Sequence, residues 1–588
     1  MNNYILAIND GIGSSAGIFK NGRALFCCEE ERFNRIKNWL GYPENVISYI
    51  LNNLDINISE IDMVVLTNER VMSEHSKESF NKYYDDNFEE AVKNLKHAYH
   101  RTNKKIKSSI KNSPLGFVNN LRLKYSKSNP NCLSTEKLIS LGFDESKINR
   151  TNHHLCHASA AYFGLAQKID EKYLVFSLDG GGDGYTSTLF KAQDGKIELF
   201  SGSKSFSIGN MYSGITYFLG FRPHEHEYKL MGLAPYVNPI YSEEYCDYFR
   251  QFLDLKNDDT EFYNPVHLNH SSFFSKLLTD LNKDRFDNIA AGLQKFTEEI
   301  CLRWIKGNIK KHGVNKILLS GGVFMNVKMN KLIAELPEVN FVDVFPSCGD
   351  ESNIFGAAYY SYNKNVKKEI GLLNSYCLGT EPSGDLESSM LKYKQKIIVE
   401  TSTSVNKKIA ELIASNNIVA RCSGKMEFGA RALGNRSIMA NPARLQNITK
   451  INQAVKKRDF WMPFAPAILI DKCESYVKIP NSIKNHGSPY MMFAVDTVND
   501  DVKRQEITCG IHQSDFTARI EGVNNKIYPD FYEIINEFYN ITGTPCVLNT
   551  SFNLHGFPIV ENSDQAIQVL LNSKIDYLII DNKIISRK

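Results

Sequence analysis

The stretch Tyr173-Leu-Val-Phe-Ser-Leu-Asp-Gly-Gly-Gly-Asp-Gly184 indicates the fold, because a short apolar strand runs into a turn of glycine and aspartate. A second strand at 186–190, an Asp-Gly hairpin turn at 193–195 and a third strand at 197–200 follow it. The N-terminus has the same order, with strands at 5–8, 16–19 and 23–26, a small-residue turn at 9–15 and an Asn-Gly turn at 21–22. The chain therefore predicts two related β-hairpin units.

Two histidines lie one helical turn apart just before this strand. His153 and His157, at positions i and i+4, share one face of the predicted helix. Asp179, at the end of the strand, can approach them from the opposite side, which is typical of a metal-assisted phosphate site. The alternative is a capped helix whose histidines pack or face solvent beside a separate glycine turn. The local pattern leaves both interpretations open.

A third glycine turn follows a later strand. Residues 316–319 open into Ser320-Gly-Gly-Val-Phe-Met-Asn326, and the helix predicted there carries Asn326 and Asn330. Glycines let backbone N–H groups reach phosphate oxygens, because no Cβ intervenes. Two hairpin units with such turns, followed by this third turn, resemble the actin-like, sugar-kinase and Hsp70 ATPase superfamily, whose two ribonuclease-H-like lobes clasp a nucleotide.

Composition and charge restrict the class of protein. The 588 residues are 42 % hydrophobic and 23 % charged, which is ordinary for about two to four globular domains. The net charge of +3 argues against a general nucleic-acid or membrane-surface protein. The twelve cysteines include no C-x-x-C pair, and the N-terminus shows no signal-peptide pattern. No apolar run reaches the roughly 20 residues of a membrane span, so we expect a soluble, cytoplasmic protein. The basic runs at 104–111 and 122–127 indicate a solvated helix face or a wall that attracts phosphate.

The sequence changes character near residue 370. A polar stretch at 363–369 ends a helix that begins near Asn353, and beyond it an amphipathic helix at 406–414 and a strand at 418–422 are expected. We therefore predict two domains, 1–370 and 371–588, with the boundary within about ten residues.

Twelve segments, in one order along nearly the whole chain, resemble the NodU/CmcH family of O-carbamoyltransferases. They are 30–37, the His-His-x-x-His segment 153–157, 178–180, 227–235, 320–323, 346–350, 425–437, 455–458, 462–466, 517–519, 542–545 and 548–553. The resemblance implies an α/β protein with an actin-like/Hsp70-like ATPase domain similar to Kae1, followed by a YrdC-like α/β domain.

The resemblance also implies chemistry in two stages. In the YrdC-like domain, carbamoyl phosphate gives carbamate, which attacks ATP to form carbamoyladenylate and pyrophosphate. In the Kae1-like domain, the carbamoyl group passes to a hydroxyl of an acceptor and AMP is released. The acceptor is expected to be a hydroxylated small molecule, such as a sugar or a natural-product scaffold. A homodimer is compatible with the sequence.

The resemblance assigns the metal ligands to His153, His157, Asp179 and Asp350. Two imidazoles and two carboxylates suit a divalent cation such as Fe²⁺, Zn²⁺ or Mn²⁺, and the resemblance favours iron. His154 points about 100° away on the helix and is expected to pack or to support the ligands. Residues expected around ATP and carbamoyladenylate are Lys37, Asp179, Gly180, Gly209, Gly321, Gly322, Asn326 and Asp350.

The second domain has to accommodate the charges of carbamoyl phosphate and the ATP triphosphate, for which guanidinium groups are suited. Glu427, four residues before Arg431, is expected to hold that arginine or to contact substrate nitrogen. In the first domain, Glu227 and Lys229 belong to a matching segment, with an exposed ion pair as the alternative. Candidates for the second-domain site are Glu427, Arg431, Arg436, Lys456, Arg458, Arg519, Asn549 and Ser551, and Arg431 is also expected to be catalytic.

Some positions depart from the family pattern, and other functions compete. Ile12 and Gly13 stand where many relatives have His-Asp, and Met462 stands where some have arginine. One competing function is threonylcarbamoyl transfer to tRNA, against which the near-neutral charge counts. The other is a non-catalytic, nucleotide-binding actin-like module, against which an intact four-ligand metal set would count.

Overall fold

The computed structural model describes residues 3–70, 133–256, 258–268, 270–366, 373, 375–456 and 459–588. The predicted basic runs at 104–127 and the candidate Arg458 lie outside these residues. The chain forms two compact units: Met1–Leu25, Glu29–Met329 and Val342–Leu372 make the first, and Phe26–Cys28, Asn330–Phe341 and Leu373–Lys588 make the second. Nothing in the sequence indicates that the short segments Phe26–Cys28 and Asn330–Phe341 belong to the second unit. The assignment of a Kae1-like and a YrdC-like domain stays a prediction.

The first unit contains two five-stranded sheets with the same topology. One has the order β3-β2-β1-β4-β5 and the other the order β8-β7-β6-β11-β12. In each sheet the central strand is antiparallel to one neighbour and parallel to the other. β1 is antiparallel to β2 and parallel to β4, and β6 is antiparallel to β7 and parallel to β11. Their bounds are β1 Tyr4–Asn9, β2 Ser15–Lys20, β3 Arg23–Glu29, β4 Ile61–Leu66, β5 Ile148–Arg150, β6 Tyr173–Gly182, β7 Tyr185–Gln193, β8 Lys196–Ser203, β11 Lys316–Ser320 and β12 Phe341–Val344. This arrangement confirms the predicted α/β class and the two ribonuclease-H-like lobes.

The hairpin turns match in both sheets, but one strand is longer than predicted. Asn21 and Gly22 have φ angles of 52° and 73°, and Asp194 and Gly195 have 53° and 73°. These are the left-handed conformations that a two-residue hairpin turn needs. The turn predicted at 179–184 is wrong in extent, because β6 continues to Gly182 with a register shift between Leu178 and Gly182. Asp179 therefore lies within β6, in the irregular stretch between these two residues.

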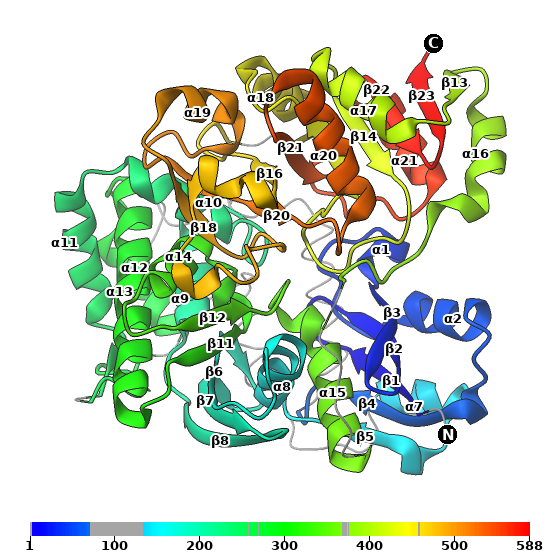
Figure 1. The fold of residues 1–588 in the computed structure, drawn as a ribbon. Coiled ribbons are helices and arrows are strands. Elements are labelled where there is room, and N and C mark those ends of the chain that lie inside the picture. Colours follow the sequence, from blue (N-terminus) through cyan, green and yellow to red (C-terminus); the bar gives the residue numbers. More distant parts are fainter. Residues whose placement is uncertain are drawn as a thin grey trace, which may run out of the picture. The chain divides into compact units, whose positions relative to one another are not determined.

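Helices cover these sheets, and two of them position the candidate site. α8 (His153–Leu165) and α15 (Asn353–Val366) lie side by side, as the cyan and green helices of Figure 1 show. α8 is nearly entirely buried, and its N-cap is Asn152, whose side chain accepts the N–H groups of His154 and Leu155. The other helices of this unit are α1 Glu31–Asn34, α2 Glu44–Asn53, α7 Leu133–Ser140, α9 Ile208–Phe218, α10 Glu227–Leu233, α11 Pro239–Arg250, α12 His270–Asp280 and α13 Phe286–His312, with α14 Val327–Ala334 at a crossing of the chain and a small sheet of β9 Asp254–Leu255 and β10 Phe262–Tyr263.

The close approach of α8 and α15 depends on Gly356. A Cβ atom at this position would lie 1.7 Å from the carbonyl oxygen of Cys156. We expect Gly356→Ala to lower the free energy of unfolding by about 3 kcal/mol, because the helices would have to separate. Chemical denaturation measures the effect. Gly214→Ala is the matched control, since its added Cβ would make only an ordinary 3.7 Å contact with Phe273. Equal stability of the two variants would contradict this view of the helix packing.

The second unit is built on an eight-stranded sheet of order β13-β23-β22-β14-β15-β21-β16-β20. Its strands are β13 Ile397–Thr401, β14 Val419–Cys422, β15 Arg436–Ala440, β16 Ala465–Leu469, β20 Glu521–Val523, β21 Cys546–Ser551, β22 Tyr577–Ile580 and β23 Lys583–Arg587. A second sheet contains β17 Val477–Lys478, β18 Ala494–Thr497 and β19 Thr517–Arg519, and the helices are α16 Leu386–Tyr393, α17 Val405–Ala414, α18 Leu445–Ile451, α19 Asp501–Glu506, α20 Pro529–Thr542 and α21 Ser563–Leu571. The predicted helix at 406–414 and strand at 418–422 are confirmed as α17 and β14.

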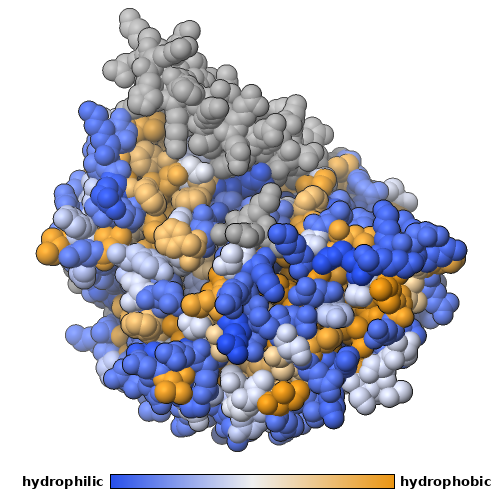
Figure 2. Space-filling model, turned by 90° about the horizontal axis from the view of Figure 1, so that it is seen from above, coloured by the Kyte–Doolittle hydropathy of each residue, from blue (hydrophilic) through white to orange (hydrophobic). Residues whose placement is uncertain are grey.

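One face of the described residues mixes polar and apolar side chains. On the face in Figure 2, hydrophobic side chains appear in small groups between hydrophilic ones. Within the described part of the chain, we find no helix with the length and apolar character needed to cross a membrane.

Candidate metal and substrate sites

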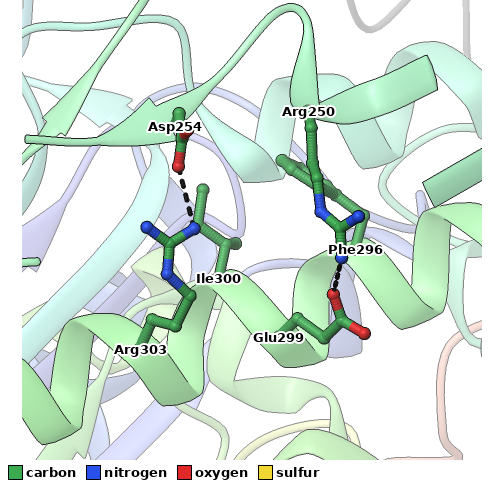
Figure 3. A pocket seen from close by; sticks show the side chains of 6 residues that line it. All are labelled: Arg250, Asp254, Phe296, Glu299, Ile300 and Arg303. Atoms are coloured by element: carbon green, nitrogen blue, oxygen red, sulfur yellow. Dashed lines mark hydrogen bonds and ion pairs between the residues drawn. The ribbon is translucent and has the colours of Figure 1, made fainter. Parts of the chain in front are cut away.

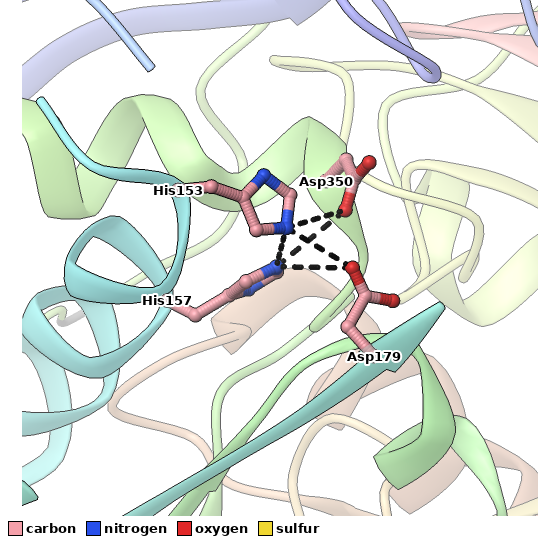
Figure 4. Close-up of side chains that lie close together, drawn as sticks. All are labelled: His153, His157, Asp179 and Asp350. Carbon is pink, nitrogen blue, oxygen red and sulfur yellow. Dashed lines mark hydrogen bonds and ion pairs between the residues drawn. The ribbon is translucent and has the colours of Figure 1, made fainter. Parts of the chain in front are cut away.

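Four side chains from three segments of the first unit point to one another (Figure 4). His153 and His157 come from the first two turns of α8, Asp179 from β6, and Asp350 from the turn before α15. His153 Nε2 lies 3.1 Å from Asp179 Oδ2 and 3.6 Å from Asp350 Oδ1, and His157 Nε2 lies 3.7 and 3.5 Å from the same two atoms. The two Nε2 atoms are 3.2 Å apart. The structure thus brings together all four predicted metal ligands.

This geometry fits a divalent metal ion. Metal–ligand bonds of about 2.0–2.2 Å around a tetrahedral centre separate the ligand atoms by about 3.3–3.6 Å, close to the spacings here. Both histidines are buried, whereas the carboxylates of Asp179 and Asp350 are 13 % and 24 % exposed, so the carboxylate side is the accessible one. Nitrogen and carboxylate donors in this ratio suit a borderline cation.

The other ring nitrogen of each histidine is also held. His153 Nδ1 lies 3.0 Å from Asn68 Oδ1, and His157 Nδ1 lies 3.3 Å from Ser320 Oγ. An amide oxygen only accepts, so His153 carries its proton on Nδ1 and directs the lone pair of Nε2 into the cluster. Asn68 and Ser320 therefore orient the two rings. Sequence reasoning missed both roles, although Ser320 stands in a glycine motif and Asn68 just after the carboxyl end of β4.

Without a metal, the histidines and aspartates of the cluster shift one another's pKa values. Burial lowers the pKa of His157, but hydrogen bonds with Asp179 and Asp350 outweigh burial and raise it to about 9. The pKa of His153 is also raised, since Asp350 and Asp179 overcome the effect of burial. Burial raises the pKa of Asp179, but hydrogen bonds from both histidines hold it well below its usual range. A metal ion entering this site therefore displaces protons.

His154 lies outside the ligand set, as predicted. Its Nδ1 is 2.9 Å from Ser177 Oγ and its Nε2 is 3.0 Å from the carbonyl oxygen of Tyr185. Burial, together with the neighbouring His153 and His157, lowers the pKa of His154 to about 3, so the ring is neutral. His154 joins α8 to the second sheet.

Asp183 is a further residue that sequence reasoning missed. Its carboxylate accepts the N–H of His153 at 2.7 Å and the N–H groups of Glu69 and Arg70 at 3.0 and 2.8 Å. It therefore fixes the start of α8 against the end of β4. Its place as the last aspartate of the stretch Asp179-Gly-Gly-Gly-Asp183 could have indicated a role.

The residues predicted around the nucleotide fall into two groups. Asp179, Gly180, Gly209 and Gly322 lie close together, because a Cβ at Gly209 would be 2.9 Å from Gly180 N and one at Gly322 would be 3.1 Å from Asp179 Oδ1. Gly321, with φ of 102°, donates its N–H to the carbonyl of Cys348. Asn326 lies just before α14, not on a helix as predicted, and exchanges two hydrogen bonds with Gln294.

Lys37 is held by an acidic partner. Its Nζ lies 2.6 Å from Glu225 Oε1, whose side chain is only 6 % exposed. Burial raises the pKa of Glu225, but Lys37 outweighs burial and lowers it to about 2. Arg222 and His226 add weaker attraction. Glu225 had not been singled out from the sequence.

The ion pair predicts an acid-dependent stability. We expect Glu225→Gln to lower the free energy of unfolding by about 2–3 kcal/mol near neutral pH. The pKa of Glu225 falls from 4.5 to about 2 on folding, so its stabilising effect is complete above the unfolded pKa and is lost as the pH falls through the folded pKa. Urea unfolding of both proteins at several pH values measures this. A difference that stays constant from about pH 7 down to about pH 3 would contradict the expectation.

The alternative of an exposed ion pair between Glu227 and Lys229 is wrong. Lys229 is 8 % exposed, and its ammonium lies over the ring of Phe221 at 5.2 Å. Glu227 accepts the hydroxyl of Ser213 at 2.8 Å and the N–H of His224 at 2.7 Å. Both residues therefore contribute to the packing of the 222–233 segment.

In the second unit, the carboxylate of Glu427 accepts hydrogen bonds from backbone N–H groups of one loop. Its Oε1 accepts the N–H groups of Leu433, Asn435 and Arg436 at 2.7, 2.8 and 3.2 Å, which shapes the loop that carries Arg431. Arg436 is fully buried and donates to the carbonyl oxygens of Ser423, Gly424, Thr380 and Glu561. The structure thus gives the terminal nitrogens of Arg436 internal partners, whereas Arg431 is half-buried.

Lys456, Ser551 and Asn549 lie along one edge of this unit's core. Lys456 Nζ donates to the hydroxyl of Ser551 at 3.0 Å and to Asn553 Oδ1 at 2.6 Å. Asn549 Nδ2 donates to the carbonyl of Ala432 and to Glu521 Oε2. Arg519 ends β19, two residues before Glu521. Glu521 was missed, because a lone glutamate in a short strand carries no motif.

A separate pocket in the first unit is lined by Arg250, Asp254, Phe296, Glu299, Ile300 and Arg303 (Figure 3). Arg303 pairs with Asp254 at 2.9 Å, and Arg250 pairs with Glu299. The charges of both guanidinium groups are thus balanced by carboxylates, and the lining includes none of the predicted site residues.

A second possible metal group, Glu243, Cys246 and Glu299, adjoins this pocket. Lys295 lies 3.2 Å from Glu243 and 2.6 Å from Glu299, and Arg250 also pairs with Glu299. Two cations already occupy the carboxylates, so the histidine–aspartate cluster is the better metal site.

Comparisons with known proteins match both halves of the chain. The family model described as "Carbamoyltransferase N-terminus" matches residues 9–359, and "Carbamoyltransferase C-terminus" matches 410–587. An uncharacterized protein of Methanocaldococcus jannaschii is 31 % identical over 99 % of both chains, and nodulation protein NolNO of Sinorhizobium fredii is 28 % identical over 98 % of this chain and 79 % of its own. Nodulation protein NolO of Bradyrhizobium diazoefficiens is 30 % identical over 73 % of this chain and 77 % of its own.

Among solved structures, full-length HypF in its phosphate- and nucleotide-bound form covers 63 % of this chain and 56 % of its own, with 11 % identity and a TM-score of 0.33. Both halves of the chain match carbamoyltransferase models, and relatives align over nearly its full length. The chain therefore belongs to the carbamoyltransferase family.

Proposed function

We propose that this protein is an ATP-dependent O-carbamoyltransferase that takes the carbamoyl group from carbamoyl phosphate and transfers it to a hydroxyl of a small molecule. The observation that carries the proposal is the four-residue cluster of His153, His157, Asp179 and Asp350 in a chain of this family. The acceptor is proposed to be a sugar or a natural-product scaffold, and the location to be cytoplasmic.

The first stage is assigned to the second unit. Water cleaves carbamoyl phosphate to carbamate and phosphate. A carbamate oxygen then attacks the α-phosphorus of ATP, and the bond to pyrophosphate breaks. Arg431, Lys456, Arg458 and Arg519 supply positive charge for these anions, which is strongest where the groups are held in place. Lys456 is held in this way by Ser551 and Asn553.

The second stage is assigned to the first unit. The acceptor hydroxyl attacks the carbamoyl carbon, loses its proton, and AMP leaves. His153, His157, Asp179 and Asp350 would hold a divalent ion, for which the family resemblance favours iron. Such an ion, when bound, polarises a carbonyl oxygen or lowers the pKa of a hydroxyl. Asn68 and Ser320 keep the two imidazoles aimed at the centre, and Ser207 holds the backbone carbonyl of Asp179 at 2.6 Å.

Pyrophosphate release without an acceptor tests the proposal. Purified protein is mixed with ATP, carbamoyl phosphate and Fe²⁺, and pyrophosphate and phosphate are followed. We expect release that requires carbamoyl phosphate, survives His153→Ala and is lost in Arg431→Ala. Release that does not depend on carbamoyl phosphate would refute the proposal.

A screen by mass then identifies the acceptor. Candidate sugars and natural products, including phosphorylated or nucleotide-linked sugars, are incubated with the complete mixture, and a product with one added carbamoyl group is sought. Modification of tRNA in place of these compounds would favour the threonylcarbamoyl alternative. Sedimentation of the same sample decides between a monomer and a homodimer.

A further inference from the structure

Three buried side chains of the second unit each keep one polar atom without a partner. Glu427, Glu521 and Asn549 are at most 1 % exposed. Within the part of the chain that the structure describes, Glu427 Oε2, Glu521 Oε1 and Asn549 Oδ1 accept or donate no hydrogen bond. Leaving such groups unpaired in a protein interior is costly, so their clustering calls for a ligand.

The three side chains converge on one loop. Asn549 Nδ2 donates to the carbonyl of Ala432 at 3.0 Å and to Glu521 Oε2 at 2.8 Å. Glu427 Oε1 accepts the N–H of the next residue, Leu433, at 2.7 Å. In each of these carboxyl and amide groups, the second polar atom is held by a hydrogen bond. The orientation of the unpaired atom is therefore set before a ligand binds.

The strand between β20 and β21 carries small residues below two of these side chains. In the register of the strands, Ala465 of β16 lies opposite Asn549 of β21, and Ala467 lies opposite Glu521 of β20. Paired residues point to the same face of a sheet, so two alanines lie between the longer side chains. A small planar group fits over such a surface better than a bulky one.

The same face also carries the predicted phosphate contacts. Ser551 follows Asn549 by two residues on β21, so both side chains point to one face about 7 Å apart. Ser551 is bonded to Lys456, one of the cations assigned to the anionic substrates. A substrate whose phosphate lies at Lys456 and Ser551 would direct its other end along β21 towards Asn549 and Glu521.

We propose that Glu521, together with Glu427 and Asn549, recognises the carbamoyl end of carbamoyl phosphate. The O=C–NH₂ group has two N–H donors and one carbonyl acceptor. Glu427 Oε2 and Asn549 Oδ1 accept the two N–H bonds, and the carboxyl of Glu521 donates from Oε1 to the carbonyl oxygen. This inference rests on the proposed function and adds a specificity-determining residue to it.

The protonation state of Glu521 agrees with this role. Burial raises the pKa of Glu521 well above its usual range, and the charge of Glu427 also raises it, whereas the hydrogen bond from Asn549 and the charge of Arg519 act in the opposite direction without outweighing burial. Oε2 already accepts a hydrogen bond from Asn549, which leaves Oε1 to carry the proton. A neutral carboxyl is both donor and acceptor, and its shape complements an amide.

The test is the choice between carbamoyl phosphate and acetyl phosphate, in which a methyl group replaces NH₂. Acceptor-free pyrophosphate release is measured with each donor for the wild type, Glu427→Gln, Glu521→Gln and Glu521→Leu. We expect the wild type to prefer carbamoyl phosphate strongly, and Glu427→Gln to lose most of this preference, because an amide N–H then faces the NH₂ group in place of an acceptor. Glu521→Leu should lower kcat/KM with both donors by at least about 100-fold, because the donor to the carbonyl oxygen that they share is gone, whereas Glu521→Gln, which still donates and accepts, should lose much less.

The outcomes separate this inference from the proposed function. No carbamoyl-phosphate-dependent release in the wild type would refute the function itself. An active wild type together with a folded Glu521→Leu variant that keeps the wild-type kcat/KM, or with a Glu427→Gln variant that keeps the full preference, would refute this recognition site alone. Glu521→Ala serves where leucine prevents folding, and failure of both variants to fold would assign Glu521 to structure and overturn the inference.

Discussion

Replacing His157 by alanine is expected to lower the affinity for Fe²⁺ by more than about 100-fold and to abolish transfer to the acceptor. His157 is fully buried and its Nε2 lies within 3.7 Å of three other ligand groups, so alanine at this position removes one of the four donors of the cluster. Pyrophosphate release without acceptor should persist, because the residues assigned to that stage lie in the second unit. Metal content after anaerobic loading and desalting, measured beside pyrophosphate release, tests both statements.

His154→Ala is the matched control for this experiment. His154 is as buried as His157 and lies on the same helix, but its ring bonds Ser177 and Tyr185 and not the cluster. We expect this variant to lose stability and to keep its metal within about three-fold of the wild type. Equal metal loss in both variants would point to a general disturbance of α8 and would contradict the assignment of His157 as a ligand.

The doubled architecture of the first unit could be predicted because its signals are local. Alternating apolar residues and the Asn-Gly and Asp-Gly turns are properties of neighbouring residues. The extension of β6 to Gly182 was not predictable, since it depends on pairing with β7 across the register shift. The exchange of residues 26–28 and 330–341 between the units likewise depends on tertiary contacts, such as that between Asn330 and the carbonyl of Met492.

The candidate site was predictable where residue type implies chemistry. The spacing of His153 and His157 and the strand that leads to Asp179 can be recognised in the sequence, Asp350 was assigned through the family resemblance, and the structure brings the four together. Asn68 lay in no motif, and the place of Asp183 at the end of the glycine stretch did not show what it binds, because an asparagine or aspartate acquires its role from what lies opposite in the fold. Glu521 is a further case, since only the burial of its carboxyl beside Glu427 distinguishes it from an ordinary strand residue.

Arg436 shows how residue type alone can mislead. The sequence places it among arginines expected to bind phosphate, yet in the structure its guanidinium donates to five carbonyl oxygens of the second unit at 3.0–3.3 Å. Apart from that of the neighbouring Asn435, those carbonyls come from segments far apart in the chain, near residues 380, 424 and 561. Arg436 is therefore placed to join three segments around the start of β15, whereas Arg431 is only half-buried.

Arg436→Met is expected to lower the free energy of unfolding of the second unit by about 3–5 kcal/mol, because five carbonyl groups, three of them in buried hydrogen bonds, would lose their donor. Urea denaturation should show an earlier transition for this unit. Arg431→Ala should unfold like the wild type and lose pyrophosphate release, which makes it the control from the same loop. If Arg436 acted only as a phosphate contact, Arg436→Met would instead match Arg431→Ala, folded and inactive. The pair of variants thus separates an arginine that holds the fold from one that binds the substrate.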